Sequence, residues 1–469
     1  MPSPRHHVII GDGATAAEFA GTAPLGAGDR LTVIGPQVAQ LGRGLAYADH
    51  PNDRPWRFAY LLNSPAAAVD PDFADWLARH WDDVADKMTG RRPDWLGFGA
   101  RHIGVGDYDA LFAPRAICGD YLRERTEAML ASLADRGVRI DRRAALATDL
   151  ARQGDGFRIT VAGGEALLAD TVDVATGGPA VQRFGSDEGE TAFGALYGNE
   201  EAIARLLKPG QEIVCLGANA AMLDVLRFAQ SVLGEDGVRL TAITASGLLP
   251  EPLIWTRPRR APVVPAISGP FETAQAFLSA IDTEIVRFRA QGATMAELRP
   301  GFKAWITEHG LEALLPPLGE RRKLGDRLER RFRRGTHDSI ADFQRLRTAG
   351  QVRLVQGRVT RVWARGTGEV EIRLDAPKQE IIAPLVVNCS GAGDQRAFDL
   401  MTTGLIRNGW LSLQAETGGI AVSAGLEANL PGLRYLSPAV TEIGDRVMPL
   451  PLYDLATLRD HVRRANGVP

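Results

Sequence analysis

The chain has 469 residues, 45% of them hydrophobic, and a formal net charge of −3. This length predicts about two or three domains with sizeable cores. The charge argues against a protein that binds nucleic acid or an anionic membrane surface. No run of about eighteen apolar residues occurs, so we expect no membrane span, and no leader-like apolar segment is recognised near the N-terminus.

The cysteines and histidines favour neither a metal centre nor a dithiol redox centre. Cys118, Cys215 and Cys389 lie far apart, and none belongs to a CxxC pair. The eight histidines show no HxxxH or HExxH spacing. We therefore expect reduced thiols in a cytoplasmic protein, and no metal site.

The first predicted elements form a strand, a glycine turn, a helix and a second strand. The apolar run at 8–10 ends in Gly11-x-Gly13-x-x-Ala16, and a β-rich run follows at 31–34. Gly11 permits a tight turn, Gly13 lets the backbone approach a pyrophosphate, and Ala16 lets the helix pack closely on the strand. The pattern predicts dinucleotide binding at the helix N-terminus, the alternative being a purely structural turn. The expected contacts are Gly11, Gly13, Ala14, Thr15 and Ala16.

The second strand lacks the carboxylate that usually follows it. In such units an acidic residue at this point binds ribose hydroxyls. Here the strand is followed by Gly35, Pro36 and Gln37. Gln37 is the nearest side chain for this hydrogen bond and carries no charge. We therefore expect Gln37 in the site, together with other contacts that compensate.

A second unit of the same kind begins near residue 211. Residues 211–224 predict a strand, a turn and a helix, and a further strand follows at 238–244. Asn219 stands where the second glycine is expected, and its side chain would crowd a pyrophosphate. The second nucleotide site is therefore expected at Gly217, Asn219 and Ala220, in a weak, altered or lost form.

Two further strands end in a small hydroxylic residue and glycine, at Thr176-Gly177 and at Ser390-Gly391. Such an ending lets the chain turn beside a bound dinucleotide and leave the domain. The order of motifs predicts an α/β protein of the two-dinucleotide flavoprotein type, with the second Rossmann-like domain inserted into the first. The expected domains are an FAD-binding domain at 1–180 plus 384–469 and an NAD(P)-binding-like domain at 181–383.

A mostly helical segment at about 269–350 lies within the second domain. Its end, 319–334, is strongly basic. One interpretation is a solvated helix face with interleaved acids. The other is a lobe that attracts an anionic cofactor or substrate. His337 follows at a predicted helix start, where it either faces the substrate or lies beside a helix cap.

Three motifs carry a family resemblance. Residues 42–47 are similar to GRGxAY, residues 61–66 to LLNxPA, and residues 112–122 to FxPRxxYGxYL, with Cys118 in place of the first tyrosine. Together with residues 247–250 and 388–391, they resemble a bacterial family of FAD/NAD(P)-binding proteins. That family is related to flavin-dependent N-hydroxylating monooxygenases of amines and amino acids.

The resemblance implies further FAD contacts. Gly42 and Gly44 would face the pyrophosphate through backbone N–H groups, while Arg43 supplies positive charge. It places the turn at 62–64 near the isoalloxazine ring, although Asn63 is alternatively a turn-capping residue. The remaining expected contacts are Leu62, Ser64, Thr176, Gly177, Ser390, Gly391, Pro451 and Leu452.

The helix that follows Pro451 and Leu452 has two interpretations. Its N-terminus either points at the pyrimidine end of reduced flavin, where the helix dipole favours an anion, or the helix is an ordinary terminal one. Arg115 and Tyr121, in the third motif, are alternatively structural.

The nicotinamide side departs from the resembling proteins. Residues 244–247 lack the arginines that would pair with an NADP 2′-phosphate. Arg257, with Arg259 and Arg260, is the candidate replacement, and the alternative is a basic surface loop.

These observations support three functions. The first is an NAD(P)H-using monooxygenase that acts on a small molecule, such as an amine or amino acid, through a flavin hydroperoxide. The second is an FAD-dependent oxidase or dehydrogenase with a degenerate NAD(P) site. The third is a non-catalytic flavoprotein. The sequence assigns no catalytic side chain because the flavin carries the chemistry.

Overall fold

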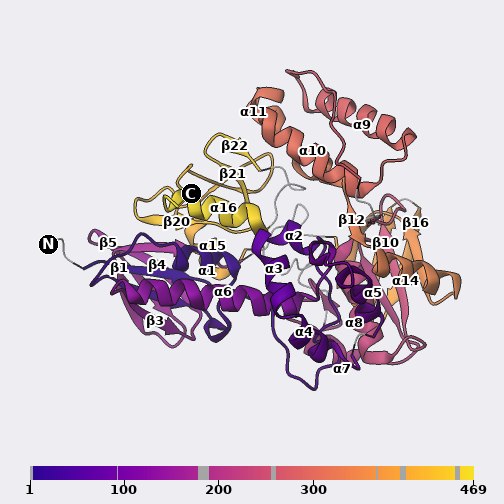
Figure 1. The fold of residues 1–469 in the computed structure, drawn as a ribbon, viewed down its shortest axis with the longest axis horizontal. Coiled ribbons are helices and arrows are strands. Elements are labelled where there is room, and N and C mark those ends of the chain that lie inside the picture. Colours follow the sequence, from indigo (N-terminus) through magenta and orange to yellow (C-terminus); the bar gives the residue numbers. More distant parts are fainter. Residues whose placement is uncertain are drawn as a thin grey trace.

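The computed structural model describes residues 4–91, 93–177, 190–254, 260–365, 368–375, 377–390, 398–448 and 455–468. Two five-stranded sheets, both parallel throughout, lie toward opposite ends of the longest axis (Figure 1). Strands in the interior of such sheets are buried on both faces, which is why the runs at 8–10, 31–34 and 213–216 are nearly continuous and apolar. The predicted α/β fold with two Rossmann-like units is confirmed.

The first sheet has the order β20-β7-β1-β2-β3. Its central strands are the ones predicted around the first glycine turn, and Ile10 pairs with Ile34 at their carboxyl ends. The strands are β1 (His6–Ile10), β2 (Arg30–Ile34), β3 (Arg139–Arg143), β7 (Thr171–Val174) and β20 (Leu433–Tyr435).

The second sheet has the order β13-β10-β9-β17-β8. Its strands are β8 (Ala192–Phe193), β9 (Glu212–Leu216), β10 (Arg239–Thr244), β13 (Val352–Gln356) and β17 (Val386–Asn388). Each sheet is accompanied by a three-stranded antiparallel sheet. These are β4 (Ala147–Gln153), β5 (Gly156–Val161) and β6 (Ala166–Ala169), and β14 (Val359–Ala364), β15 (Val370–Asp375) and β16 (Lys378–Ala383).

The position of β17 changes one expected domain boundary. Its Val386 pairs with Val214 of β9, so this strand belongs to the second sheet. The expected boundary at residue 384 had placed it with the first domain. We therefore propose that the chain leaves the second domain after β17, and that the first domain resumes in the part of the chain that contains β20.

Each unit has one helix that begins directly after its glycine turn: α1 (Ala14–Gly21) and α8 (Ala220–Leu233). The first unit also contains α6 (Arg115–Asp135), α15 (Leu400–Arg407) and α16 (Leu455–Ala465). Four further helices follow the LLNxPA segment: α2 (Ala66–Val69), α3 (Pro71–Arg79), α4 (Trp81–Met88) and α5 (Pro93–Ile103). Within the described parts of the chain, no helix is both long and apolar enough to cross a membrane.

A helical lobe stands out from the two sheets in Figure 1 and lies within the predicted segment 269–350. It contains α9 (Ala274–Ala290), α10 (Met295–His309), α11 (Leu311–Leu314), α12 (Leu318–Arg322) and α13 (Gly325–Arg331). Its basic end is paired with acids: Arg331 forms two hydrogen bonds of 2.6 Å with Asp282, and Arg322 contacts Glu442. These pairs accord with the interpretation of interleaved charges.

Candidate dinucleotide sites and an adjoining pocket

The N-terminus of α1 has no side-chain cap. Its N-cap residue is Gly13, and the carbonyl of Gly13 accepts the backbone N–H of Ala17 at 3.0 Å. Gly11 has a φ of +131°, and a Cβ added there would lie 2.2 Å from the carbonyl oxygen of Ala175. Only glycine therefore fits at position 11. Because the N-cap residue Gly13 has no side chain, it offers no side-chain acceptor to the first N–H groups of α1.

The GRGxAY segment lies against the same turn. A Cβ on Gly44 would lie 3.2 Å from the Cα atom of Gly13. Gly42 has a φ of +101°, and a Cβ there would lie 2.6 Å from the hydroxyl of Thr126 on α6. The two glycine segments therefore meet backbone to backbone beside the start of α1. We call this pair of segments, residues 11–16 and 42–44, the glycine cradle.

Arg43 does not direct its charge into the cradle. Its side chain is buried, donates to the carbonyl of Ala116 at 3.2 Å and forms an ion pair with Asp120. The expected role of Arg43, a positive charge beside the pyrophosphate, stays a prediction, because the structure shows only that this charge is paired with Asp120. The guanidinium of Arg43 anchors the segment to α6 because a buried charge needs a partner and hydrogen bonds.

Gln37, the expected ribose contact, is exposed. Its backbone N–H, rather than its side chain, makes the local contact, donating to Oδ2 of Asp12 at 2.6 Å. Burial raises the pKa of Asp12. Asp12 was not among the expected contacts, although the acid in the glycine turn and Gly35 after β2 are both present in the sequence.

The turn at 62–64 is held from two sides. The N–H of Leu62 donates to the carbonyl of Ala113 at 3.0 Å. Arg334, in β12 (Arg334–Thr336), donates to the carbonyl of Asn63 at 3.1 Å and to the hydroxyl of Ser64 at 2.9 Å. This role of Arg334 was not predictable from the sequence, where the residue is one member of the basic run 319–334.

The two strands that precede Thr176-Gly177 and Ser390-Gly391 belong to different sheets. The hydroxyl of Thr176 donates to Asp399, the N-cap of α15, at 2.8 Å, and Gly177 has a φ of +98°. Ser390 was expected in the FAD site, but it follows β17 in the second sheet. A Cβ on Gly217 would lie 2.8 Å from the Cα atom of Ser390, so Ser390 lies beside the second glycine turn. Three expected contacts, Gly391, Pro451 and Leu452, lie outside the described residues.

The second glycine turn differs from the first because a side chain caps the helix that follows it. Asn219 is the N-cap of α8, and its side-chain oxygen accepts the backbone N–H of Ala221 at 2.9 Å. Its φ of −128° is extended, so it does not use the left-handed conformation of a glycine. The side chain thus occupies a donor that a bound phosphate would use. Arg257 and Arg259 lie outside the described residues, and Arg260 donates to the carbonyl of Gly292 at 2.8 Å.

Arg115 and Tyr121 are both held in buried polar contacts. Arg115 lies 3.4 Å from Asp224 of α8, which also accepts the hydroxyl of Tyr197 at 2.5 Å. Burial raises the pKa of Asp224. Tyr121 donates to Asp70. These contacts accord with the structural alternative for both residues, and the first of them links α6 to α8.

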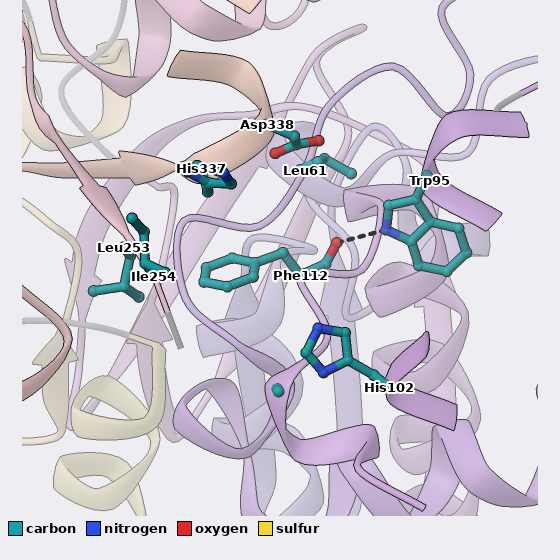
Figure 2. A pocket seen from close by; sticks show the side chains of 9 residues that line it. Leu61, Trp95, His102, Phe112, Leu253, Ile254, His337 and Asp338 are labelled. Atoms are coloured by element: carbon teal, nitrogen blue, oxygen red, sulfur yellow. Dashed lines mark hydrogen bonds between the residues drawn. The ribbon is translucent and has the colours of Figure 1, made fainter. Parts of the chain in front are cut away.

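A cavity of 80 Å³ lies next to the turn at 62–64, beside Leu61. Figure 2 shows its apolar walls and, at its edges, two imidazoles and a carboxylate. The carboxylate, Asp338, accepts a hydrogen bond from Arg227 at 3.2 Å. The exposed side chain of His337 lines this cavity at the start of α14 (His337–Thr348), where the sequence placed a substrate-facing candidate. The lining residues are Leu61, Trp95, His102, Ala110, Phe112, Leu253, Ile254, His337 and Asp338.

Comparisons with known proteins agree with this architecture. A family model described as FAD-NAD(P)-binding matches residues 8–179. The chain is similar to the reduced form of ornithine hydroxylase from Pseudomonas aeruginosa, with a TM-score of 0.51 and 13% identity over 98% of this chain and 100% of that one. It is also similar to the FAD-bound cadaverine monooxygenase of desferrioxamine biosynthesis from Erwinia amylovora, with a TM-score of 0.50 and 13% identity over 98% of this chain and 92% of that one.

At these identities, the two structures establish the shared fold and nothing finer. No curated protein sequence matches the chain.

Proposed function

Because a family model described as FAD-NAD(P)-binding matches residues 8–179, we propose that the protein is an FAD-dependent oxidoreductase that acts on a small molecule. The observation that carries this proposal is the glycine cradle at the uncapped N-terminus of α1. Bare backbone on both sides and unused N–H groups suit a diphosphate, which is large, anionic and rich in acceptors. The residues present therefore fit the FAD that the family implies.

We propose that Gly11, Gly13 and Gly44 hold the diphosphate through close backbone approach. The turn at 62–64, fixed by Arg334, would then contact the isoalloxazine ring. When bound, the flavin supplies the oxidation–reduction chemistry. The protein's part is to bind and orient it and to exclude water from the reacting atoms.

The cavity beside Leu61 is the proposed substrate site. Its walls include Trp95 and Phe112, which exclude water, while His102 and His337 lie where a substrate proton can be held or moved. The finer proposal, a monooxygenase of amines or amino acids, rests on the family resemblance. Asp338 accepts a hydrogen bond from Arg227 in this structure, so its negative charge is already paired and is not dedicated to binding a cationic amine.

The contact made by Asn219 supports a second candidate function, in which the substrate reduces the flavin and NAD(P)H does not. In the first candidate, a monooxygenase, NAD(P)H would bind at α8 and reduce the flavin directly. The hydrogen bond from Ala221 to Asn219 occupies part of that helix N-terminus. A substrate-reduced oxidase or dehydrogenase needs no nucleotide there, and this contact supports it.

The testing experiment begins with the visible spectrum and released cofactor of the purified protein, which should show FAD. The protein is then mixed anaerobically with NADPH and, separately, with NADH. Rapid bleaching of the oxidised flavin band supports the monooxygenase. Bound FAD that neither cofactor bleaches supports the substrate-reduced enzyme or the non-catalytic flavoprotein. Absence of any FAD binding contradicts the whole proposal.

Substrate turnover separates a substrate-reduced enzyme from a non-catalytic flavoprotein, which turns over no substrate. A panel of primary amines and amino acids is tested by anaerobic flavin reduction and by oxygen consumption. An oxidase or dehydrogenase substrate bleaches the flavin without NAD(P)H. A monooxygenase substrate raises oxygen consumption only when NAD(P)H is present.

A further inference from the structure

The end of β2 lacks a carboxylate of its own, but the structure brings one there from the glycine turn that follows β1. Ile10 and Ile34 are paired, and the N–H of Gly11 donates to the carbonyl of Ile34 at 2.8 Å. The residue after Gly11 is Asp12. Its side chain therefore starts at the carboxyl end of β1, directly beside the carboxyl end of β2.

The carboxylate of Asp12 lies on Gly35. A Cβ built on Gly35 would lie 2.5 Å from Oδ2 of Asp12, and its three nearest atoms all belong to Asp12. Gly35 is absent from the positive-φ glycines, so its backbone does not itself require glycine. The reason for a glycine at 35 is that the Asp12 side chain fills the space that a side chain at 35 would use.

Position 35 is the one from which a dinucleotide-binding unit usually presents its ribose-binding acid, directly after the second strand. We propose that Asp12 binds the ribose hydroxyls of the adenosine half of FAD, from the glycine turn instead of from the end of β2. This assignment rests on the proposed function.

The chemistry of the group supports the assignment. A carboxylate offers about four acceptor positions, so the hydrogen bond from Gln37 to Oδ2 leaves acceptor capacity for hydroxyl donors. Hydrogen bonds to an ionised acceptor are about twice as strong as those between neutral groups. The competing interpretation is that Asp12 serves only to hold the backbone at Gln37.

The test uses the full chain, stripped of cofactor and titrated with FAD, and with ADP against 2′,3′-dideoxy-ADP. Wild type should bind ADP more tightly than the dideoxy compound. Asp12→Ala should weaken FAD by about tenfold or more, the expected loss for a charged hydrogen bond, and should bind ADP and dideoxy-ADP equally. Asp155→Ala is the control and should change nothing, because Asp155 is an exposed acid in the turn between β4 and β5.

A double variant makes the test specific. In the variant that combines Asp12→Ala with Gly35→Glu, removal of the Asp12 side chain leaves space for a side chain at position 35. The new glutamate then places a carboxylate at the end of β2. This variant should recover FAD affinity and the preference for ADP over dideoxy-ADP. Asp12→Asn keeps the shape of the side chain, so a loss of the preference in that variant, with an unchanged melting temperature, also supports the assignment.

Two results overturn the assignment, and they differ from each other. If FAD binds and Asp12→Ala weakens ADP and dideoxy-ADP by the same factor, Asp12 has only a structural role and the proposed function stands. If wild type binds neither FAD nor ADP, the proposed function fails together with the assignment.

Discussion

The side-chain oxygen of Asn219 accepts the backbone N–H of Ala221 at 2.9 Å, so the chain itself caps the helix of its second nucleotide unit. The corresponding residue of the first unit is Gly13, which leaves α1 without a side-chain cap. Two units of the same design thus differ at the helix terminus where a phosphate would bind. The difference separates a helix N-terminus that is open to a ligand from one that is partly occupied by a side chain of the chain itself.

Replacing Asn219 with glycine should open the second site. We expect Asn219→Gly to bind NADPH or NADH more tightly, by about tenfold, since one charge-assisted hydrogen bond is worth about 1.5–3 kcal/mol. The loss of stability should be only a few tenths of a kcal/mol, because glycine is itself an accepted N-cap residue. The measurement is the rate of anaerobic flavin reduction against cofactor concentration.

The matched control is Asn199→Gly, at the N-cap of α7 (Glu200–Leu206), where the asparagine makes no capping hydrogen bond. It should leave the reduction rate unchanged. If wild type is already reduced rapidly by NADPH and Asn219→Gly does not improve it, the Asn219 cap is no obstacle to the nucleotide.

A valine at position 13 should remove FAD without unfolding the protein. A Cβ on Gly13 lies 3.8 Å from the Cα atom of Gly44, an ordinary contact, but the branched methyl groups would fill the glycine cradle. We expect Gly13→Val to purify without flavin and with a circular dichroism spectrum like that of wild type.

Gly26→Val is the matched control for this substitution, because a Cβ at Gly26 meets no atom within 4 Å. It should retain full flavin occupancy. A yellow Gly13→Val protein with the same flavin content as wild type would place the FAD site elsewhere.

Arg334 should raise the midpoint potential of the flavin if the turn at 62–64 borders the isoalloxazine ring. Its guanidinium donates to Asn63 and Ser64, and a nearby positive charge stabilises the reduced, anionic flavin. We expect Arg334→Met to lower the midpoint potential by a few tens of millivolts, since about 30 mV corresponds to about 1.4 kcal/mol for a two-electron couple.

A dye-coupled anaerobic titration measures this potential. Arg331→Met is the control, because Arg331 belongs to the same basic run but is paired with Asp282 in the helical lobe. Equal potentials in wild type and Arg334→Met would show that the turn lies away from the ring.

Local patterns were enough to predict the nucleotide units. A short apolar run, a glycine turn and a second apolar run specify strand, turn and helix through nearby residues alone, and β1, α1 and β2 follow that prediction. The uncertainty over the second turn was also visible in the sequence, because Asn219 replaces a glycine. The structure adds what that side chain does: it caps its own helix.

Contacts between distant segments were not predictable in this way. The sheet to which β17 belongs depends on pairing with β9, which no local pattern specifies. The contact of Asp12 with Gly35 arises only once β1 and β2 are aligned. Arg43 was read as a phosphate ligand because its charge was visible, whereas its partner Asp120 lies on a helix that packs against it only in the fold.

The C-terminal helix should depend on one buried arginine. Arg459 of α16 contacts Glu18 of α1 at 3.2 Å and also pairs with Asp70, the N-cap of α3, so it joins three elements of the first unit. Arg459→Ala leaves both acids buried with less compensation. We expect a loss of about 3–5 kcal/mol, typical of breaking a buried ion pair, measured by chemical unfolding.

Arg463→Ala is the control in the same helix. Arg463 lies 3.8 Å from Glu18, at the limit of an ion-pair contact, and its side chain is 34% exposed. Because solvent screens this arginine, we expect a loss below about 1 kcal/mol. Equal losses for the two variants would contradict the role assigned to Arg459.

The effect of Arg459 should also depend on pH. Burial raises the pKa of Asp70, but Arg459 and the hydroxyl of Tyr121 lower it by more, so the net shift is downward. A carboxyl with a lowered folded pKa contributes its full stability above the unfolded value, about 3.9 for Asp, and loses it as the pH falls through the folded pKa. The stability difference between wild type and Arg459→Ala should therefore be largest near neutral pH and shrink below about pH 4. A difference that stays constant down to pH 3, on the same unfolding curves, would mean that Arg459 acts through packing and not through its charge.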